Sequence, residues 1–440
     1  MRRRGSGMFI ALALVLAGTA CIGGGGGGSE ESSDQAGGKT VISFFTGTAE
    51  TAALEAKAKQ EIALFEEENP DIQVEREALP PDDVRTVIQT RLRSNNPPDV
   101  FTFDTGPGFG GVLADAGLLY PLDVAYKQNG WKIYDWARQR ATYNGKTYGV
   151  PTQVEELGVY YNKDVFDELG FDEPKTLDEL RQIAEAVRDK DMIPLAFGDN
   201  EKWPAGHLFS MAVSNLLGRQ GLDRILYGGG RWNEPAVVKG IDLFFRDFVS
   251  GGYYPEDVNA ITYDDANTLF YGGKAAMLPT GTWLVAELEE TVRDFEIGFF
   301  PFPSIDGSSI SPAAGVGSGY FVAADTDEPK AAIKLLDFFL SQKTGQRTAE
   351  EFNTIPAYPL ETSGLEVPPL FKEVLSDLSS APESSFGYNI DVLTPVEFND
   401  VMFDGFQDVL NADRTAQEQA DALQQAWAKA EKAGETLEKP

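Results

Sequence analysis

One stretch decides the fold of this chain: residues 41–103 read VISFFTGTAETAALEAKAKQEIALFEEENPDIQVEREALPPDDVRTVIQTRLRSNNPPDVFTF. The hydrophobic spacing along it alternates between the period of a strand and that of a helix. It predicts strands at 41–45, 72–74 and 99–103 and helices at 54–65 and 84–92. Asn69-Pro70 and Pro97-Pro98 end the two helices. This β-α-β-α-β order predicts an α/β fold with a mostly parallel sheet covered by helices.

The same pattern continues toward the C-terminus. Further strands are expected at 157–161, 295–300 and 320–323, and a strongly apolar helix at 331–340. Thr176 with Glu179, and Thr415 with Glu418, are spaced as capping boxes that open two more helices. A chain of 440 residues exceeds what a single core accommodates, so we expect two lobes.

The N-terminus has the pattern of an export signal. Three arginines precede an apolar run at 8–16, which is too short to span a bilayer, and small residues then lead to Cys21, the only cysteine. We expect a signal peptide at 1–20, lipid attachment at Cys21 and a flexible Gly, Ser and acid-rich tether at 21–39. Simple cleavage that leaves a free thiol is the alternative. The expected location is the outer face of the cytoplasmic membrane.

The chain is strongly acidic, with a formal net charge of −32. Removing residues 1–20 takes away three of the 37 basic residues and none of the 69 acids, which leaves −35. Nucleic acids and anionic membranes repel such a surface, so neither is an expected partner.

The residues needed for common catalytic sites are scarce. His207 is the only histidine, so zinc sites rich in His and Cys and Cys-His nucleophiles are excluded by count. The sequence contains no Gly-x-Ser-x-Gly elbow, phosphate loop or calcium loop. We therefore expect no catalytic residues, cofactor or metal, although 69 acids leave a glycosidase-type carboxylate pair open.

Three tryptophans near Gly or Pro suggest binding instead: Trp203, Trp232 and Trp283. An aromatic plate suits the apolar C–H face of a sugar ring, and polar groups around it suit the hydroxyls. Core packing is the alternative for each of the three. Tyr253-Tyr254, a pair that can bind ferric iron, is interpreted as a turn after a helix because no second histidine is available.

Several short motifs follow one another in a specific order: Phe65-Glu-Glu-Glu-Asn-Pro-Asp-Ile72, Pro98-Asp99-Val100, Leu118-Leu-Tyr-Pro-Leu122, Tyr143-Asn-Gly-Lys-Thr-Tyr-Gly-Val-Pro151, Tyr160-Tyr-Asn-Lys163, Gly273-Lys-Ala-Ala-Met277 and Gly281-Thr-Trp283. From about Val41 to the last helix, this order resembles family 1 of the extracellular solute-binding proteins of ABC importers. That carbohydrate-type branch includes maltodextrin and multiple-sugar binders.

The resemblance implies a periplasmic-binding-protein-like fold of type II. Two α/β lobes would exchange the chain across a hinge three times, near Gln153, Pro312 and Pro356. The lobes would comprise residues 40–153 with 313–355, and 154–312 with 356–440. Ligand would lie between them, beyond the carboxyl ends of strands, and the lobes would close on it.

The resemblance also implies ligand-binding positions. They are Thr46, Gly47, Thr48 and Asp104 in the first lobe, Glu155 after the first crossing, Trp203 and Trp283 in the second lobe, and Gly317 and Ser318 on a return strand. Trp232 is added to these candidates from its place beside Gly230 alone. The segment Pro395-Val-Glu-Phe398 lacks the tryptophan that maltodextrin binders carry nearby, which argues against a long glucan.

The sequence therefore predicts a monomeric, non-enzymatic lipoprotein that captures a sugar or oligosaccharide and hands it to ABC permease subunits. Two alternatives stay open at this point. One is a receptor for another solute, such as ferric ion or a polyamine, and the other is an exported glycosidase.

Overall fold

A computed structural model describes residues 38–49, 51–380 and 386–437. The expected signal peptide, the lipid-attachment residue Cys21 and nearly all of the tether lie outside these residues. The described residues from Lys39 onward form one compact unit. No helix within the described ranges is both long and apolar enough to cross a membrane.

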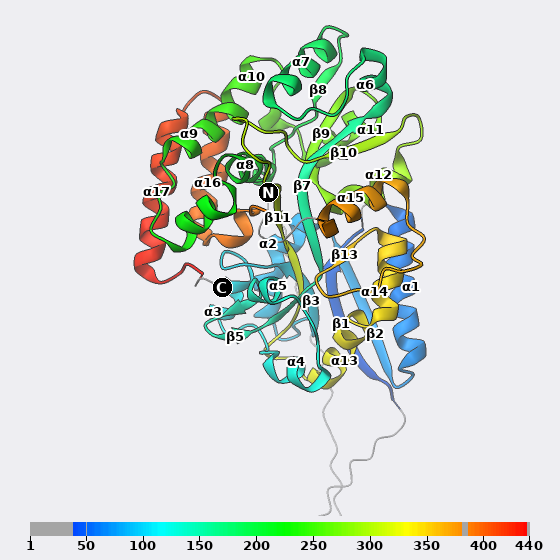
Figure 1. Ribbon diagram of the computed structural model, residues 1–440. Coiled ribbons are helices and arrows are strands. Elements are labelled where there is room, and N and C mark those ends of the chain that lie inside the picture. Colours follow the sequence, from blue (N-terminus) through cyan, green and yellow to red (C-terminus); the bar gives the residue numbers. More distant parts are fainter. Residues whose placement is uncertain (1–37, 50, 381–385, 438–440) are drawn as a thin grey trace, which may run out of the picture. The chain divides into compact units, whose positions relative to one another are not determined.

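The described segments contain both strands and helices (Figure 1). The strands are β1 (Thr40–Gly47), β2 (Ile72–Leu79), β3 (Val100–Asp104), β4 (Thr142–Tyr143), β5 (Lys146–Thr147), β6 (Gly149–Pro151), β7 (Gln153–Asn162), β8 (Ile193–Leu195), β9 (Ala275–Gly281), β10 (Ile297–Phe300), β11 (Ala313–Gly315), β12 (Ser318–Val322) and β13 (Ile355–Pro356). The α-helices are α1 (Ala52–Glu68), α2 (Pro81–Leu92), α3 (Gly110–Asp115), α4 (Asp123–Asn129), α5 (Asp135–Gln139), α6 (Lys163–Leu169), α7 (Leu177–Arg188), α8 (Trp203–Tyr227), α9 (Pro235–Asp242), α10 (Phe248–Ser250), α11 (Tyr263–Tyr271), α12 (Val285–Thr291), α13 (Pro329–Phe339), α14 (Gln342–Phe352), α15 (Pro369–Ser380), α16 (Val396–Leu410) and α17 (Ala416–Ala433).

The first sheet has the strand order β2-β1-β3-β12-β6 and lies in the lower part of Figure 1. β1 runs parallel to β2 and to β3, as the alternating pattern of residues 41–103 predicts. β12 runs antiparallel to β3, with Ser318 paired to Asp104. The carboxyl ends of β1 and β3 and the start of β12 therefore meet at one edge of the sheet.

The second sheet is built around the long strand β7, in the order β10-β7-β9-β8. β7 runs antiparallel to β10 and to β9, so those two strands share one direction, and β8 is parallel to β9. The short strands β11 and β13 also pair with β7. β7 is thus the central strand of the second sheet and begins directly after β6 of the first sheet.

The chain passes between the sheets at three places. The first lies between β6 and β7, at Thr152. The second lies at 316–317, between β11 and β12, a few residues beyond the expected Pro312. The third is β13, which pairs with β7 while the next residues, Ala357 and Tyr358, are buried in the core of the first sheet. All three run side by side at the centre of the unit.

The sequence signals for helix ends act as expected. Thr176 and Thr415 each accept a hydrogen bond from a backbone amide three residues later, and Glu179 and Glu418 complete both capping boxes. Tyr253 and Tyr254 follow α10 and a glycine turn, and both are buried against Phe248. The interpretation of this pair as a turn after a helix is therefore confirmed.

Candidate ligand-binding site

Most of the expected polar contacts of the first lobe gather around one cavity. It has a volume of about 400 Å³ and lies at the edge where β1, β3 and β12 meet. The expected residues that line it are Thr46, Gly47, Thr48, Asp104 and Ser318. They are brought together because parallel strands end at the same edge of a sheet.

Asp104 does not face this cavity as a free charge. Arg85 of α2 makes two hydrogen bonds to it, with Nε 2.6 Å from Oδ2 and an Nη2–Oδ1 distance of 3.1 Å. The same guanidinium also bonds Asp82, with Nη1 2.6 Å from Oδ1. This fork-like pairing holds the Asp104 carboxylate in one orientation and balances its charge.

Glu155 lies where the sheets join, near the start of β7. The Gly317 amide donates to its Oε2 over 3.1 Å, and the Gln153 side chain donates to its Oε1 over 2.9 Å. A β-carbon on Gly317 would lie 2.5 Å from Glu155 Oε2, so this approach requires glycine. The expected pair of Glu155 and Gly317 is thus in direct contact.

Burial changes the acidity of Glu155, which is 9% exposed. Desolvation raises the pKa of its carboxyl from 4.5 to about 7, against the opposing effect of the two hydrogen bonds. The carboxylates of Asp104 and Asp391 raise this pKa further. The Glu155 carboxyl is therefore partly protonated near neutral pH, and the Asp104 and Asp391 carboxylates contribute to this shift.

Aromatic rings gather at the ends of β9 and α8 in the second lobe. The ring of Trp203 lies 4.5 Å from Tyr263 and 6.5 Å from Trp283, between centroids. His207 packs against both indoles, and its Nε2 lies 3.7 Å from an oxygen of Asp391. The expected residues Trp203 and Trp283 therefore belong to one cluster, and Asp391 is the carboxylate next to it.

Trp283 is held in a defined orientation. Its Nε1–H donates to the Tyr263 hydroxyl over 3.0 Å, and that hydroxyl lies 2.8 Å from Thr280 Oγ1. The indole folds back over Gly281, where a β-carbon would come within 1.8 Å of the ring. A small hollow beside β7 is lined by both Trp283 and Gln153, and Gln153 also lines the larger cavity of the first lobe. Gln153 thus connects the aromatic cluster to the polar edge.

Trp232 lies elsewhere, and its expected role in the site needs correction. It is 0% exposed and packs with Phe209, Phe398 and Trp427. Its position beside Gly230 suggested a loop plate, but α8, α16 and α17 enclose the indole. The core-packing alternative describes this tryptophan, and we leave it out of the site.

The sequence analysis did not select Arg85, Gln153, Tyr263 or Asp391 as site residues. Gln153 could have been found, because it precedes Glu155 by two residues and side chains two apart lie on the same face of a strand. Arg85 resembled any other surface cation of a helix, and Tyr263 and Asp391 have no sequence signal. Their roles depend on long-range packing.

The arrangement offers stacking surfaces and hydrogen-bonding groups. The described ranges contain no group of three or more His, Cys, Asp or Glu residues suited to hold a metal ion. Indole faces near carboxyl, amide and hydroxyl groups suit a ligand with apolar faces and a polar rim.

The sequence model of the bacterial extracellular solute-binding protein family matches residues 46–346. Among characterised relatives, the chain is 28% identical to the multiple sugar-binding protein of Streptococcus mutans, over 74% of this chain and 76% of that protein. It is 27% identical to the maltotriose-binding protein of Pyrococcus abyssi, over 69% of this chain and 62% of that protein.

Solved structures agree in fold. A chitin oligosaccharide binding protein superposes with a TM-score of 0.78 at 24% identity, covering 90% of this chain and 99% of that one. The maltose/maltodextrin-binding domain of Bdellovibrio bacteriovorus, bound to maltotriose, superposes with a TM-score of 0.69 at 21% identity, covering 89% and 100%. The predicted two-lobed α/β fold is confirmed.

Proposed function

The chain belongs to the bacterial extracellular solute-binding proteins, an exported and non-enzymatic family, and on that premise we propose that it captures a sugar or short oligosaccharide between its two lobes for an ABC importer. The observation that carries the proposal is the juxtaposition around β7. Trp283 of the second lobe and the polar edge of the first lobe share the neighbour Gln153. Glu155 bonds to Gly317 at the same crossing.

Each part of this site has a role in the proposal. The Trp283 indole is the plate on which a pyranose ring stacks, since its Nε1–H is already bonded to Tyr263 and its orientation is fixed. Trp203 Nε1–H has no hydrogen-bond partner among the described residues and is a donor for a ligand oxygen. Glu155, Asp104 and the loop Thr46-Gly47-Thr48 bind hydroxyls. A buried hydroxyl without a partner costs about 1–3 kcal/mol, so this polar rim determines which sugar fits.

Names of relatives support a carbohydrate ligand. The multiple sugar-binding and maltotriose-binding proteins each match well over half of this chain. A cationic ligand is less suited to the site, because Arg85 already balances Asp104 and because burial holds the pKa of Glu155 near 7.

We propose that residues 40–153 with 313–355 and residues 154–312 with 356–440 move as the two lobes. One contact between the two lobes lies at the start of α1, where the Thr51 hydroxyl donates to Glu290 of α12 over 2.6 Å. The pKa of Asp264, raised mainly by burial, is raised further by the Asp82 carboxylate of α2. Elements of both lobes thus approach at the rim of the site, as a closing cleft requires.

The ligand is proposed to be short. Phe398, in the segment that lacks a tryptophan, is buried in the core beside Trp232 and offers no second plate.

Delivery to a membrane permease by a monomer anchored through Cys21 completes the proposal. Replacing Cys21→Ser is expected to release the protein into the medium and to abolish fatty-acid labelling. Labelling of the variant equal to that of the native chain would refute the anchor.

Titration calorimetry tests the proposed function. The protein is titrated with a panel of mono- to trisaccharides, with spermidine and ferric citrate as competing ligand classes. We expect one sugar to bind one-to-one with micromolar affinity, about −8.2 kcal/mol. Chromatography of the mixture should recover that sugar unhydrolysed. Tight binding of spermidine or ferric citrate, with no sugar binding at millimolar concentration, would overturn the proposal.

A further inference from the structure

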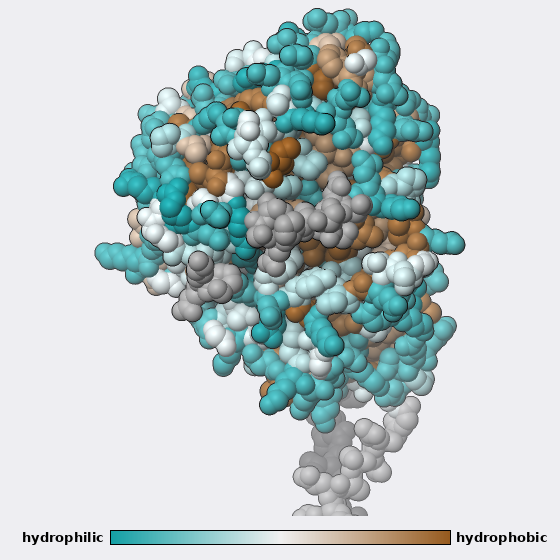
Figure 2. All heavy atoms as spheres, viewed as in Figure 1, coloured by the Kyte–Doolittle hydropathy of each residue, from teal (hydrophilic) through white to brown (hydrophobic). Residues whose placement is uncertain are grey.

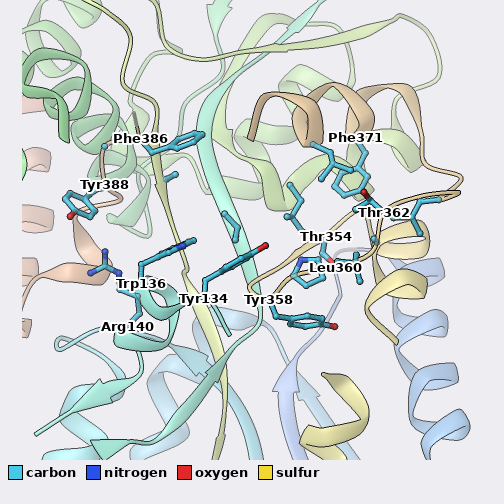
Figure 3. A pocket seen from close by; sticks show the side chains of 18 of the residues that line it. Tyr134, Trp136, Arg140, Thr354, Tyr358, Leu360, Thr362, Phe371, Phe386 and Tyr388 are labelled. Atoms are coloured by element: carbon cyan, nitrogen blue, oxygen red, sulfur yellow. The ribbon is translucent and has the colours of Figure 1, made fainter. Parts of the chain in front are cut away.

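A second cavity, here called the hinge pocket, is drawn from close by in Figure 3. It has a volume of about 350 Å³. Each of the three crossings lines it, through Val154 of β7, Ala314 of β11 and Ile355 of β13. Figure 2 draws one face of the unit, and at mid-height hydrophobic residues gather mainly on its right-hand side. None of the side chains proposed to contact the sugar lines this pocket.

One end of the hinge pocket carries two cations. Arg140 is only 3% exposed, and its Nε and Nη1 have no hydrogen-bond partner among the described residues. Arg219 lines the same pocket. The guanidinium carbons of Arg140 and Arg219 lie over the Tyr388 ring, 5.3 and 4.1 Å from its centroid. Two positive groups therefore share one aromatic neighbour at this end.

The carboxylate of Asp223 pairs with Arg219, one of these two cations. Asp223 accepts the Tyr388 hydroxyl over 2.7 Å and pairs with Arg219 over 3.3 Å. Arg140 keeps two donors without a hydrogen-bond partner in a site that water scarcely reaches. Buried charged groups in proteins are ordinarily paired, because an uncompensated charge is costly to desolvate. The unfilled donors of Arg140 indicate an anion that is not part of the described chain.

The remainder of the hinge pocket is apolar. Figure 3 shows Arg140 beside Trp136 and Tyr388 at one side, and Phe371 and Leu360 at the other. The rings of Tyr134 and Trp136 stack with 9° between their planes. A fully hydrated inorganic ion would leave these surfaces unused. The occupant needs an anionic head and an apolar body.

We propose that the hinge pocket binds a small amphipathic carboxylate, such as an aromatic acid, with its carboxylate on Arg140. The Arg140 guanidinium supplies a buried positive charge that a carboxylate neutralises, and a charge-assisted contact of this kind is stronger than a neutral one. The aromatic and aliphatic wall accommodates the ring. A cavity of this size is typical of sites for small organic ligands.

The hinge pocket and the sugar site are distinct but adjacent. They share Thr354, Pro356 and Tyr358 of the third crossing. The aromatic cluster of Trp203 and Trp283 does not line the hinge pocket. A variant of the cluster therefore serves as a control for binding at the hinge.

Calorimetry with sodium benzoate at fixed ionic strength tests this proposal, with neutral benzamide as the matched probe. We expect one-to-one binding of benzoate and binding of benzamide weaker by about tenfold or more, since only the anion neutralises the buried Arg140 charge. Arg140→Met should weaken benzoate binding by a similar factor, and Trp203→Ala should leave benzoate binding unchanged.

Three results would overturn the proposal: no benzoate binding at millimolar concentration, equal binding of benzoate and benzamide, or unchanged benzoate affinity in Arg140→Met. If that variant does not fold by circular dichroism, Arg140→Gln replaces it, because the amide keeps a hydrogen-bonding group but carries no charge. Benzoate affinity unchanged in Arg140→Gln would then count against the site. None of these readouts involves a sugar, so failure here is distinct from failure of the proposed function.

Discussion

Gly317 donates its backbone amide to the Glu155 carboxylate over 3.1 Å and so ties the second crossing to the start of β7. The contact joins a residue that leads into the first sheet to a strand of the second sheet. It exists only because Gly317 has no side chain in the path of the carboxylate. The position of Glu155 in the proposed sugar site depends on it.

Replacing Gly317→Ala should reduce sugar affinity by about tenfold while changing the thermal midpoint little. The added methyl group would lie 2.5 Å from Glu155 Oε2, and the carboxylate, at the end of a flexible side chain, would turn aside. Calorimetry and thermal unfolding measure the two effects. Gly272→Ala is the matched control, since its nearest contact is an ordinary 3.4 Å to the Thr268 oxygen. Equal affinity in Gly317→Ala and the native chain would remove Glu155 from the site.

Glu155→Gln should change how stability depends on pH. The pKa of Glu155 rises from 4.5 to about 7 in the folded chain, so its protonated form favours folding. This stabilisation is complete below about 4.5 and is lost as the pH rises through about 7. Between pH 4 and 8, the free energy of unfolding of the variant should gain up to about 3 kcal/mol relative to the native protein.

Urea unfolding at a series of pH values measures that difference. Glu66→Gln, at a half-buried carboxylate of α1 that accepts from the Val74 amide, is a control distant from the hinge. A difference between Glu155→Gln and the native chain that stays constant across this pH range would contradict the raised pKa.

Trp283→Ala should weaken sugar binding by more than tenfold, because it removes the stacking plate. Tyr263→Phe should have a smaller effect, since it keeps the ring cluster and removes only the acceptor of the Trp283 N–H group. Calorimetry with the sugar identified in the panel measures both variants. If Trp283→Ala binds as tightly as the native protein, the plate lies elsewhere.

Trp232→Ala should lower the stability of the protein and leave its sugar affinity unchanged. Its indole is wholly buried against Phe398 and Trp427, so truncation should cost about 3–5 kcal/mol of stability. Any protein that remains folded should bind sugar with native affinity. Urea unfolding and calorimetry separate the two quantities, and a stable variant with lost binding would return Trp232 to the site.

The fold could be predicted well from residues 41–103 because strand and helix periods alternate there without ambiguity. β1, α1, β2, α2 and β3 all formed where the spacing predicts them. The capping boxes at Thr176 and Thr415 were equally reliable, since a cap depends on residues three apart and not on tertiary packing.

The site was harder to predict because its parts come from distant segments. Trp232 and Trp283 both stand near glycines, and the sequence offers no means to tell a core indole from an accessible one. The difference arises from α17, whose Trp427 covers Trp232, about 200 residues further along the chain. Arg85 and Tyr263 were missed for the same reason, as each acts through a partner that only the fold brings near.

A crystal structure of the protein with the sugar that binds most tightly is the most direct test of binding between the lobes. We expect a pyranose ring stacked on Trp283, a hydroxyl within hydrogen-bond distance of Glu155, and further contacts from the edge that holds Thr46 and Asp104. A sugar bound outside this site, with the indole of Trp283 uncovered, would contradict the proposed function.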